Sequence, residues 1–303
     1  MRVGVSLRSG YGGVGAREGA RWMVERARAA RRAGLDSLFV GDHHATGGAY
    51  YQNSPVLGRL LAEWGPATAG ALYLLPLWHP VIVAEQVATL AAVAEGPFVL
   101  QCALGDGESQ FRALGADLRR RPSRFEEALS VVRRLLAGEE VSSAGGWSVE
   151  GARIGPLPPE PVTVWIGASA PPALDRAARL GDAWLAGPYG TPEELAGQVA
   201  HYRAACEAHG RAPAVMAVRR DIHVGATDDD ARRVAGPVVA AGYRGLRPEV
   251  LVVGGPESVA GEFRRLAGLG FTDVIVRHLA DGQADVLASF ERLVEVRRLV
   301  ADA

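Results

Sequence analysis

Residues 34–44 read Gly-Leu-Asp-Ser-Leu-Phe-Val-Gly-Asp-His-His, and this stretch decides the fold class. Gly34 follows a segment, Ala16–Ala33, whose apolar residues recur at helical spacing, and a glycine commonly ends a helix in this way. The short, mostly apolar run Ser37–Val40 then predicts a buried strand, and polar residues follow it directly. A helix, a buried strand and a polar strand end in this order form one step of an α/β fold.

The same step repeats along the whole chain. The predicted strands are Val3–Leu7, Ser37–Val40, Ala69–Leu75, Phe98–Ala103, Val162–Ile166, Ala183–Ala186, Val215–Val224 and Asp273–Arg277. They are mostly apolar runs, as expected when a parallel sheet is covered by helices on both faces. We therefore predict an α/β fold: a single (β/α)8 barrel domain over residues 1–303, with insertions after strands two, four and seven. A glycine- and proline-rich stretch, Gly138–Pro161, predicts a small hairpin.

The composition narrows the classes of function. The chain has 303 residues, of which 48% are hydrophobic, so a large core needs no disulfide or metal. A net charge of −1 gives no electrostatic reason to expect nucleic acid or an anionic membrane as a partner. The first residues predict a strand rather than a signal peptide, and Cys102 and Cys206 form no disulfide framework, so we expect a cytoplasmic protein. Helices rich in Ala and Gly lead us to expect a homodimer.

A competing interpretation comes from residues 10–15, Gly-Tyr-Gly-Gly-Val-Gly, which fit the dinucleotide-binding pattern G-x-G-x-x-G between a strand and a helix. The acidic residue that would hold the ribose is Asp42, 27 residues after Gly15, whereas about 20 is usual. The alternation of strands and helices also continues to the C-terminus without a second domain. A flexible glycine-rich loop is the simpler interpretation, and an NAD-binding dehydrogenase that uses the Gly10–Gly15 loop is the alternative.

Asp42, His43 and His44 are the candidate catalytic residues, because the active site of a (β/α)8 barrel forms at the carboxyl ends of its strands. Histidine changes charge near neutral pH, and a neighbouring carboxylate can orient it or raise its pKa. Successive strand residues point to opposite sides, so only one of the two histidines can face the mouth if the strand persists. Two surface histidines without a role are the alternative. A metal site is not expected, because vicinal histidines rarely chelate one ion and Asp106 is the only further obvious ligand.

Gly167, Ala168, Ser169 and Ala170 form a second candidate site. These small residues lead from the fifth predicted strand into a helix, where backbone N–H groups and the helix dipole attract a phosphate. A helix cap at Ser169 would need no ligand, and this remains the alternative.

The chain resembles the luciferase-like monooxygenase superfamily, which includes FMN-dependent monooxygenases and enzymes that use the deazaflavin coenzyme F420. Its ordered matching blocks include Gly34–His44, Leu75–Pro80, Ala84–Leu90, Val164–Ser169, Ala177–Trp184 and Gly254–Val259. The resemblance implies an oxidoreductase that acts on a small organic substrate with reduced FMN or F420, and a separate reductase as partner. It leaves monooxygenation and hydride transfer open. A flavin-binding barrel without catalysis is a further alternative.

The resemblance also implies roles for individual residues. His43 matches the catalytic histidine of the family, with an acid before it. The backbone of Leu74 and Leu75 matches the region beneath the cofactor ring, where the family often has a cis peptide bond without proline. Gln101 matches a polar residue that meets the ring edge, and Gly167–Ala170 match the phosphate-binding loop.

Overall fold

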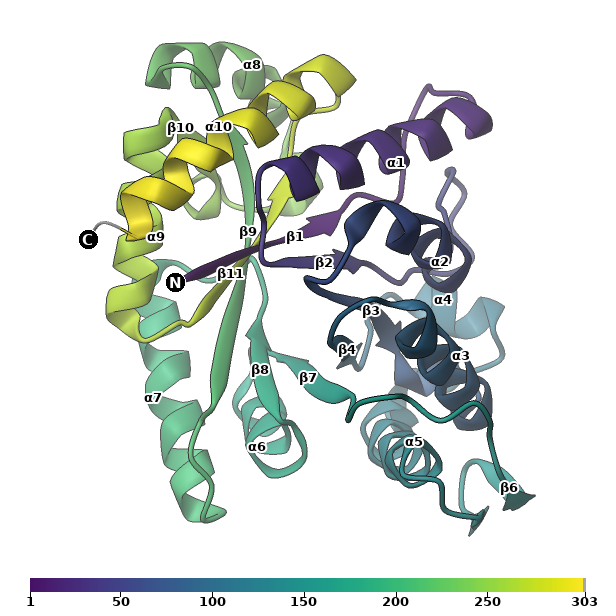
Figure 1. Ribbon diagram of the computed structural model, residues 1–303. Helices are drawn as coiled ribbons and strands as arrows, with labels where there is room; N and C mark the ends of the chain where they lie inside the picture. The colour runs from purple at the N-terminus through teal and green to yellow at the C-terminus, as the bar shows by residue number, and fades with distance from the viewer. Residues whose placement is uncertain (302–303) are drawn as a thin grey trace. The chain divides into compact units, whose positions relative to one another are not determined.

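The computed structural model describes residues 1–301. The strands are β1 (Arg2–Leu7), β2 (Ser37–Val40), β3 (Thr68–Leu74), β4 (Phe98–Ala103), β5 (Val141–Ala144), β6 (Ser148–Ala152), β7 (Thr163–Ala168), β8 (Ala183–Ala186), β9 (Val215–Val224), β10 (Val252–Gly254) and β11 (Asp273–His278). The α-helices are α1 (Ala16–Arg32), α2 (Asn53–Trp64), α3 (Pro80–Val93), α4 (Glu108–Ala113), α5 (Arg121–Leu136), α6 (Pro171–Leu180), α7 (Pro192–Ala208), α8 (Asp228–Ala240), α9 (Pro256–Leu269) and α10 (Gln283–Ala301). Figure 1 shows their course along the chain.

The chain forms two compact units, which we describe separately. Unit 1 comprises Met1–Arg8, Arg21–Leu38 and the described part of Trp165–Ala303, and unit 2 comprises Ser9–Ala20 and Phe39–Val164. Both units follow the predicted alternation of strands and helices. Within residues 1–301, no helix combines the length and the apolarity that a bilayer crossing requires.

Unit 1 is built on parallel strands in the order β7, β8, β9, β11 and β1. Ala217 in β9 lies opposite Leu185 on one side and Asp273 on the other, which fixes the register of three strands. The short strand β10 pairs with the last residues of β9. Helix α10 packs against α9 and against β9, as Figure 1 shows in yellow and green. Because the strands are parallel, their carboxyl ends lie at the same edge of this sheet.

Unit 2 contains the parallel pair β3 and β4, with α2 and α3 packed on these strands. Close approach explains Gly70: a Cβ atom there would lie 2.3 Å from the carbonyl oxygen of Val99 and 2.9 Å from the Phe39 ring. The predicted hairpin is present as the antiparallel pair β5 and β6. Glu127 of α5 holds it by accepting hydrogen bonds from the backbone of Gly146 and Trp147.

Candidate functional site

The buried carboxylate of Asp42 ties the end of β2 to the end of β3. Its Oδ2 accepts a hydrogen bond from the backbone N–H of Leu74 and another from the Trp78 indole, both at 2.8 Å. Its Oδ1 lies 3.1 Å from Nε2 of His44. The side chain has no exposed surface, so all its interactions are with protein groups. Asp42 is therefore a residue that positions the segment after β3.

The two histidines after Asp42 have different surroundings. The His44 ring is enclosed beside Asp42 and meets the Trp78 ring edge-on at 5.2 Å between centroids. The His43 side chain is exposed and meets the Tyr50 ring edge-on at 5.7 Å. Gln52 donates to the carbonyl oxygen of His43, which fixes the loop without occupying the imidazole. One histidine is thus packed and the other is open. Strand β2 ends at Val40, so the turn after it, and not strand alternation, sets this difference, and Asp42 lies beside His44 rather than His43.

The peptide bond between Leu74 and Leu75 is trans, so the cis bond that the resemblance implied is not found. Within residues 1–301 the single cis bond precedes Pro156. Local hydrogen bonds account for the ordinary geometry here. Asp42 holds the Leu74 amide, and the Leu75 carbonyl accepts from the Trp78 amide, which closes a 3-10 turn over Leu75–Leu77. Both leucines are buried.

Gln101 carries the clearest sign of a missing ligand in unit 2. It lies in β4 opposite Leu72, and only 5% of its surface is exposed. Its Nε2 is buried and has no hydrogen-bond partner among the described residues. A buried N–H group without a partner costs about 1–3 kcal/mol, which a ligand acceptor would recover. The neighbouring Cys102 is fully buried and acts in packing.

A polar network that the sequence did not predict connects the start of α2 to strand β3, which is paired with β4. Asn53 donates to the carbonyl oxygen of Leu72 at 2.7 Å. The Ser54 and Tyr73 hydroxyls are 2.7 Å apart, and Ser54 also contacts Gln86. Burial raises the pKa of Tyr73, so this phenol stays neutral. Asn53 and Ser54 open α2 within an insertion, and only that position at a helix start could have drawn attention to them.

The segment Gly167–Ala170 lies in unit 1, at the end of β7 and before α6. Ala170 occupies the N-cap position and Ser169 is exposed, so a helix cap at Ser169 is ruled out. The first two helical residues, Pro171 and Pro172, have no N–H group, which removes two of the donors that a helix start offers. The donors left for an anion are the backbone N–H groups of Ser169 and Ala170 and the Ser169 hydroxyl.

The predicted site residues therefore fall into two sets. Asp42, His43, His44, Leu74, Leu75 and Gln101 belong to unit 2, and Gly167, Ala168, Ser169 and Ala170 belong to unit 1. The convergence of both sets on one ligand stays a prediction. In the described part of the chain, no group of three or more His, Cys, Asp or Glu side chains is arranged to hold a metal ion.

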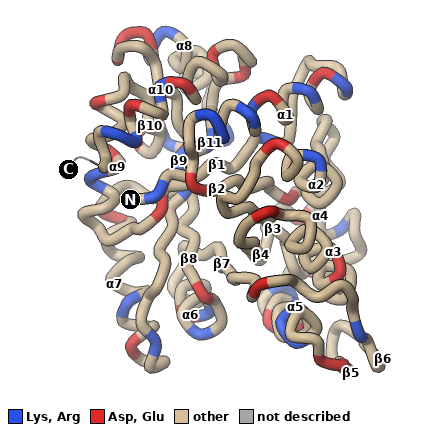
Figure 2. Tube along the Cα trace, in the orientation of Figure 1, with Lys and Arg blue, Asp and Glu red and all other residues tan. Residues whose placement is uncertain are grey.

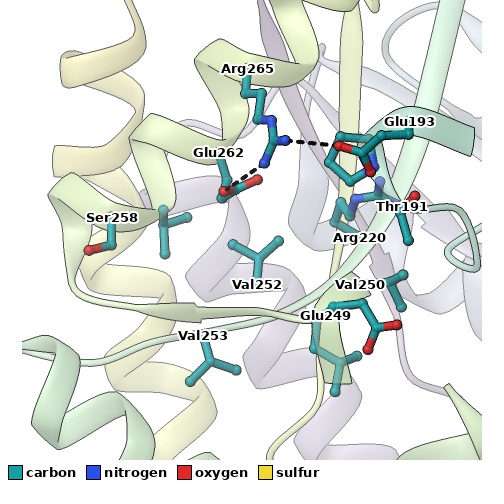
Figure 3. Close-up of a pocket in the computed structure, with 13 residues that line it drawn as sticks. Thr191, Glu193, Arg220, Glu249, Val250, Val252, Val253, Ser258, Glu262 and Arg265 are labelled. Atoms are coloured by element: carbon teal, nitrogen blue, oxygen red, sulfur yellow. Dashed lines mark hydrogen bonds and ion pairs between the residues drawn. The ribbon is translucent and has the colours of Figure 1, made fainter. Parts of the chain in front are cut away.

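A cavity of about 480 Å³ in unit 1 contains none of the predicted site residues. Figure 3 shows its charged side chains, among them Arg220, Glu193, Glu262 and Arg265. Arg265 pairs with Glu193 at 3.4 Å and with Glu262 at 3.9 Å, and Arg220 donates to the Gly190 carbonyl. Because these charged side chains are already paired or hydrogen-bonded, we do not assign a ligand to this cavity and regard it as a packing gap between α7, α9 and β10.

Two histidines of unit 1, His223 and His278, are buried at the ends of β9 and β11. Burial lowers the pKa of both, and lowers that of His278 to about 3. The His278 ring packs on Phe290 with 4.2 Å between centroids, and its Nε2 has no hydrogen-bond partner among residues 1–301. This imidazole is therefore a neutral packing group at physiological pH.

Replacing His278 with Phe is expected to reduce the acid sensitivity of the fold. Between about pH 6.5 and pH 3 this histidine is protonated in the unfolded chain but neutral in the native state. The free energy of unfolding therefore decreases as the pH is lowered through this range. The loss is at most about 1.4 kcal/mol per pH unit. Urea unfolding between about pH 6 and pH 4 should show that the free energy of unfolding depends less steeply on pH in the variant than in the wild type. His201→Phe is the control, because this exposed histidine pairs with Asp175 at the surface; an unchanged slope in His278→Phe would contradict the assignment.

Comparison with known proteins gives one family and one fold. The sequence profile of the luciferase-like monooxygenase family matches residues 1–249. An F420-dependent glucose-6-phosphate dehydrogenase from Beutenbergia cavernae is 35% identical over 190 residues. The aligned part covers 59% of this chain and 56% of that relative, so the chain spans little more than half the length of the relative it matches.

Two solved structures align with almost the whole chain. The oxygenating constituent of 3,6-diketocamphane monooxygenase from Pseudomonas putida, in complex with FMN, aligns at a TM-score of 0.84 and 17% identity, over 100% of this chain and 98% of its own. An F420-dependent secondary alcohol dehydrogenase in complex with an F420–acetone adduct aligns at a TM-score of 0.80 and 19% identity, over 99% and 98%. At these identities the likeness shows the fold, and it confirms the predicted (β/α)8 barrel.

Proposed function

Because the chain belongs to the luciferase-like monooxygenase family, we propose that it is an oxidoreductase that transfers hydride between coenzyme F420 and a small organic substrate. The observation that carries the proposal is the buried, unpartnered Nε2 of Gln101, in a chain that is 35% identical over 190 residues to an F420-dependent dehydrogenase. A reduced-FMN monooxygenase is the second candidate, favoured by the full-length likeness to an FMN-bound structure.

Each unit offers groups that suit one part of a cofactor with a flat ring and a phosphate tail, and their contact with the same cofactor molecule is part of the proposal. Gln101 would donate through Nε2 to an acceptor on the ring edge, which satisfies its buried N–H group. Leu74 and Leu75 would offer an apolar wall for the flat ring. The N–H groups of Ser169 and Ala170 would hold the phosphate, with the dipole of α6 behind them. When bound, the cofactor would supply hydride transfer if it is F420, or oxygen activation if it is reduced FMN.

His43 is the residue that we propose moves a proton. Its imidazole is exposed and accepts or donates at a ring nitrogen, while Gln52 and Tyr50 hold the loop that carries it. Asp42 acts on the site indirectly, since its contacts are Leu74, Trp78 and His44. The other parts of the proposal are a cytoplasmic location, a homodimer and a separate reductase. The proposal of a homodimer is supported by two exposed apolar residues of α3, Ile82 and Val93, whose relative exposures are 42% and 57%.

Titration of the purified protein with F420 and, separately, with reduced FMN tests the proposal. We expect saturable binding of F420, and we expect Gln101→Leu to weaken it by about 5–10-fold, because one hydrogen bond to the ring is lost. Gln52→Leu is the matched control, since its amide bonds only to a loop carbonyl. Tighter binding of reduced FMN would favour the second candidate. Binding of neither cofactor would overturn both, and NAD binding in its place would favour the Gly10–Gly15 alternative.

A further inference from the structure

Strand β9 carries three consecutive charged residues, Arg219, Arg220 and Asp221, although it is mostly buried. Strands β3, β4, β7 and β8, by contrast, have no charged residue, and Figure 2 shows them in tan. In the neighbouring strand β11, Arg277 lies directly opposite Asp221. Because successive strand residues point to opposite faces, Arg219, Asp221 and Arg277 share one face and Arg220 lies on the other.

The carboxylate of Asp221 is already engaged. Arg219 donates to it through two nitrogens, each at 2.8 Å, in a bidentate pair. Arg244, from the insertion after β9, approaches the same carboxylate at 3.7 Å. The Asp221 side chain is fully buried; desolvation raises its pKa, but Arg219, Arg277 and Arg244 together lower it. One acid therefore balances one of the positive charges gathered around it.

Arg277 shares the carboxylate of Asp221 with two other arginines and forms no ion pair with it. Within residues 1–301 it makes no ion pair or hydrogen bond, and its Nε is buried without a partner. Desolvation, followed by the charges of Arg219 and Arg244, lowers its pKa to about 10, so the guanidinium stays charged at neutral pH. Three guanidinium groups and one carboxylate leave an excess of two positive charges. Arg277 is half-buried, with its Nε enclosed, so this excess of positive charge lies within reach of an anion from solvent.

One uncharged polar group, the hydroxyl of Tyr243, lies beside this cluster of arginines. The Tyr243 hydroxyl is buried, has no partner among the described residues, and lies close enough for its charge state to be coupled to Arg277 and Asp221. Tyr189 lies near Arg219 and is 57% exposed, which gives the cluster an edge toward solvent. The Tyr189 ring and the Ser169 hydroxyl both lie close to Gly187, so the cluster is near the segment that follows β7. Because three guanidinium groups surround a single carboxylate, the cluster is suited to bind an anion.

We propose that Arg277, with Arg219, Arg244 and Tyr243, binds an oxyanion group of the substrate, so that the substrate is a carboxylic acid or a phosphate ester. The word substrate rests on the proposed function; the anion site itself does not. Arg219 donates to Asp221 through Nε and Nη2, which leaves its Nη1 for a ligand. The guanidinium of Arg277 forms no hydrogen bond with the described residues, so its planar set of N–H donors is available. A carboxylate and a phosphate both match that fork in bidentate geometry.

Calorimetric titration of the cofactor-free protein with inorganic phosphate and with succinate, at constant ionic strength, tests the anion site. We expect saturable binding of at least one of them, and at least about tenfold weaker binding to Arg277→Met, since one charged pair is lost. Tighter binding of phosphate would indicate a phosphate ester as the substrate, and tighter binding of succinate would indicate a carboxylic acid. Arg232→Met is the control, because this exposed arginine pairs with Asp229 on α8. Absence of saturable binding in the wild type, or equal binding to Arg277→Met, overturns the proposal.

Two further measurements distinguish a substrate site from a structural arginine and from a cofactor site. Without added anion, Arg277→Met should have a Tm equal to or above that of the wild type, because one of three clustered positive charges is removed; a clear decrease would assign Arg277 a structural role instead. Affinities for F420 and reduced FMN should be the same in the variant and the wild type. A parallel loss of cofactor affinity would mean that the anion belongs to the cofactor and would overturn the substrate assignment. Since the anion titration uses no cofactor, it can succeed when the proposed function fails.

Discussion

His43→Ala is expected to lower turnover by about 10²–10⁴-fold, the usual contribution of a general acid or base. The reason is the exposed imidazole at the end of β2, which the fold holds in place through its backbone and leaves chemically free. Cofactor affinity should stay nearly unchanged, because the groups proposed to hold the cofactor are Gln101 and the amides near Ser169. Steady-state kinetics and a cofactor titration on the same preparation measure both quantities.

His44→Ala is the matched control for this experiment. His44 lies against Asp42 and Trp78, so its removal should mainly affect folding stability and should lower turnover less than His43→Ala does. If His44→Ala abolishes turnover while His43→Ala does not, the proton is moved by the enclosed ring and the assignment is wrong.

Asp42→Ala is expected to reduce the free energy of unfolding by about 3–5 kcal/mol, which is large for a single substitution. The change removes the acceptor of two hydrogen bonds at 2.8 Å, and leaves the Leu74 amide and the Trp78 indole without their partner. Urea unfolding followed by circular dichroism measures the effect. Asp42→Asn keeps an oxygen acceptor and should cost less.

Asp106→Ala provides the control for Asp42→Ala. This aspartate is exposed in the loop after β4, and its substitution should change stability by less than about 0.5 kcal/mol. Equal stabilities of Asp42→Ala and the wild type would show that the hydrogen bonds to Leu74 and Trp78 contribute nothing to folding. A loss of turnover without a loss of stability would assign Asp42 a direct catalytic role.

Most of the fold could be predicted because its strands are apolar runs whose lengths suit a buried parallel sheet. The strands Ser37–Val40, Ala183–Ala186 and Val215–Val224 have the predicted bounds. The three-residue strand β10 was missed, since so short a run has no pattern of its own and forms by pairing with Ile222 to Val224. Helix α4, at only six residues, was missed for a similar reason.

For the candidate site, the sequence predicted which residues follow each strand but not their contacts. Asp42 follows β2 as expected, yet no local pattern tells which histidine its carboxylate will contact, because this depends on the turn after β2. Ser169 looked like a helix cap until the structure showed Ala170 in that position. Arg277 ends its predicted strand, but the excess of positive charge around Asp221 could be seen only with β9 in register beside β11. The one sequence signal was the run of charges from Arg219 to Asp221.

The alternation along β9 also limits how this chain can change in length. Arg219 and Asp221 face one side of the sheet, and Arg220 faces the cavity on the other. One residue inserted or deleted before Arg219 within the strand would exchange the two sides and move Arg220 into the place of its neighbours. Gaps between this chain and relatives that keep the same charge arrangement should therefore fall before Val215 or after Val224, and not between them.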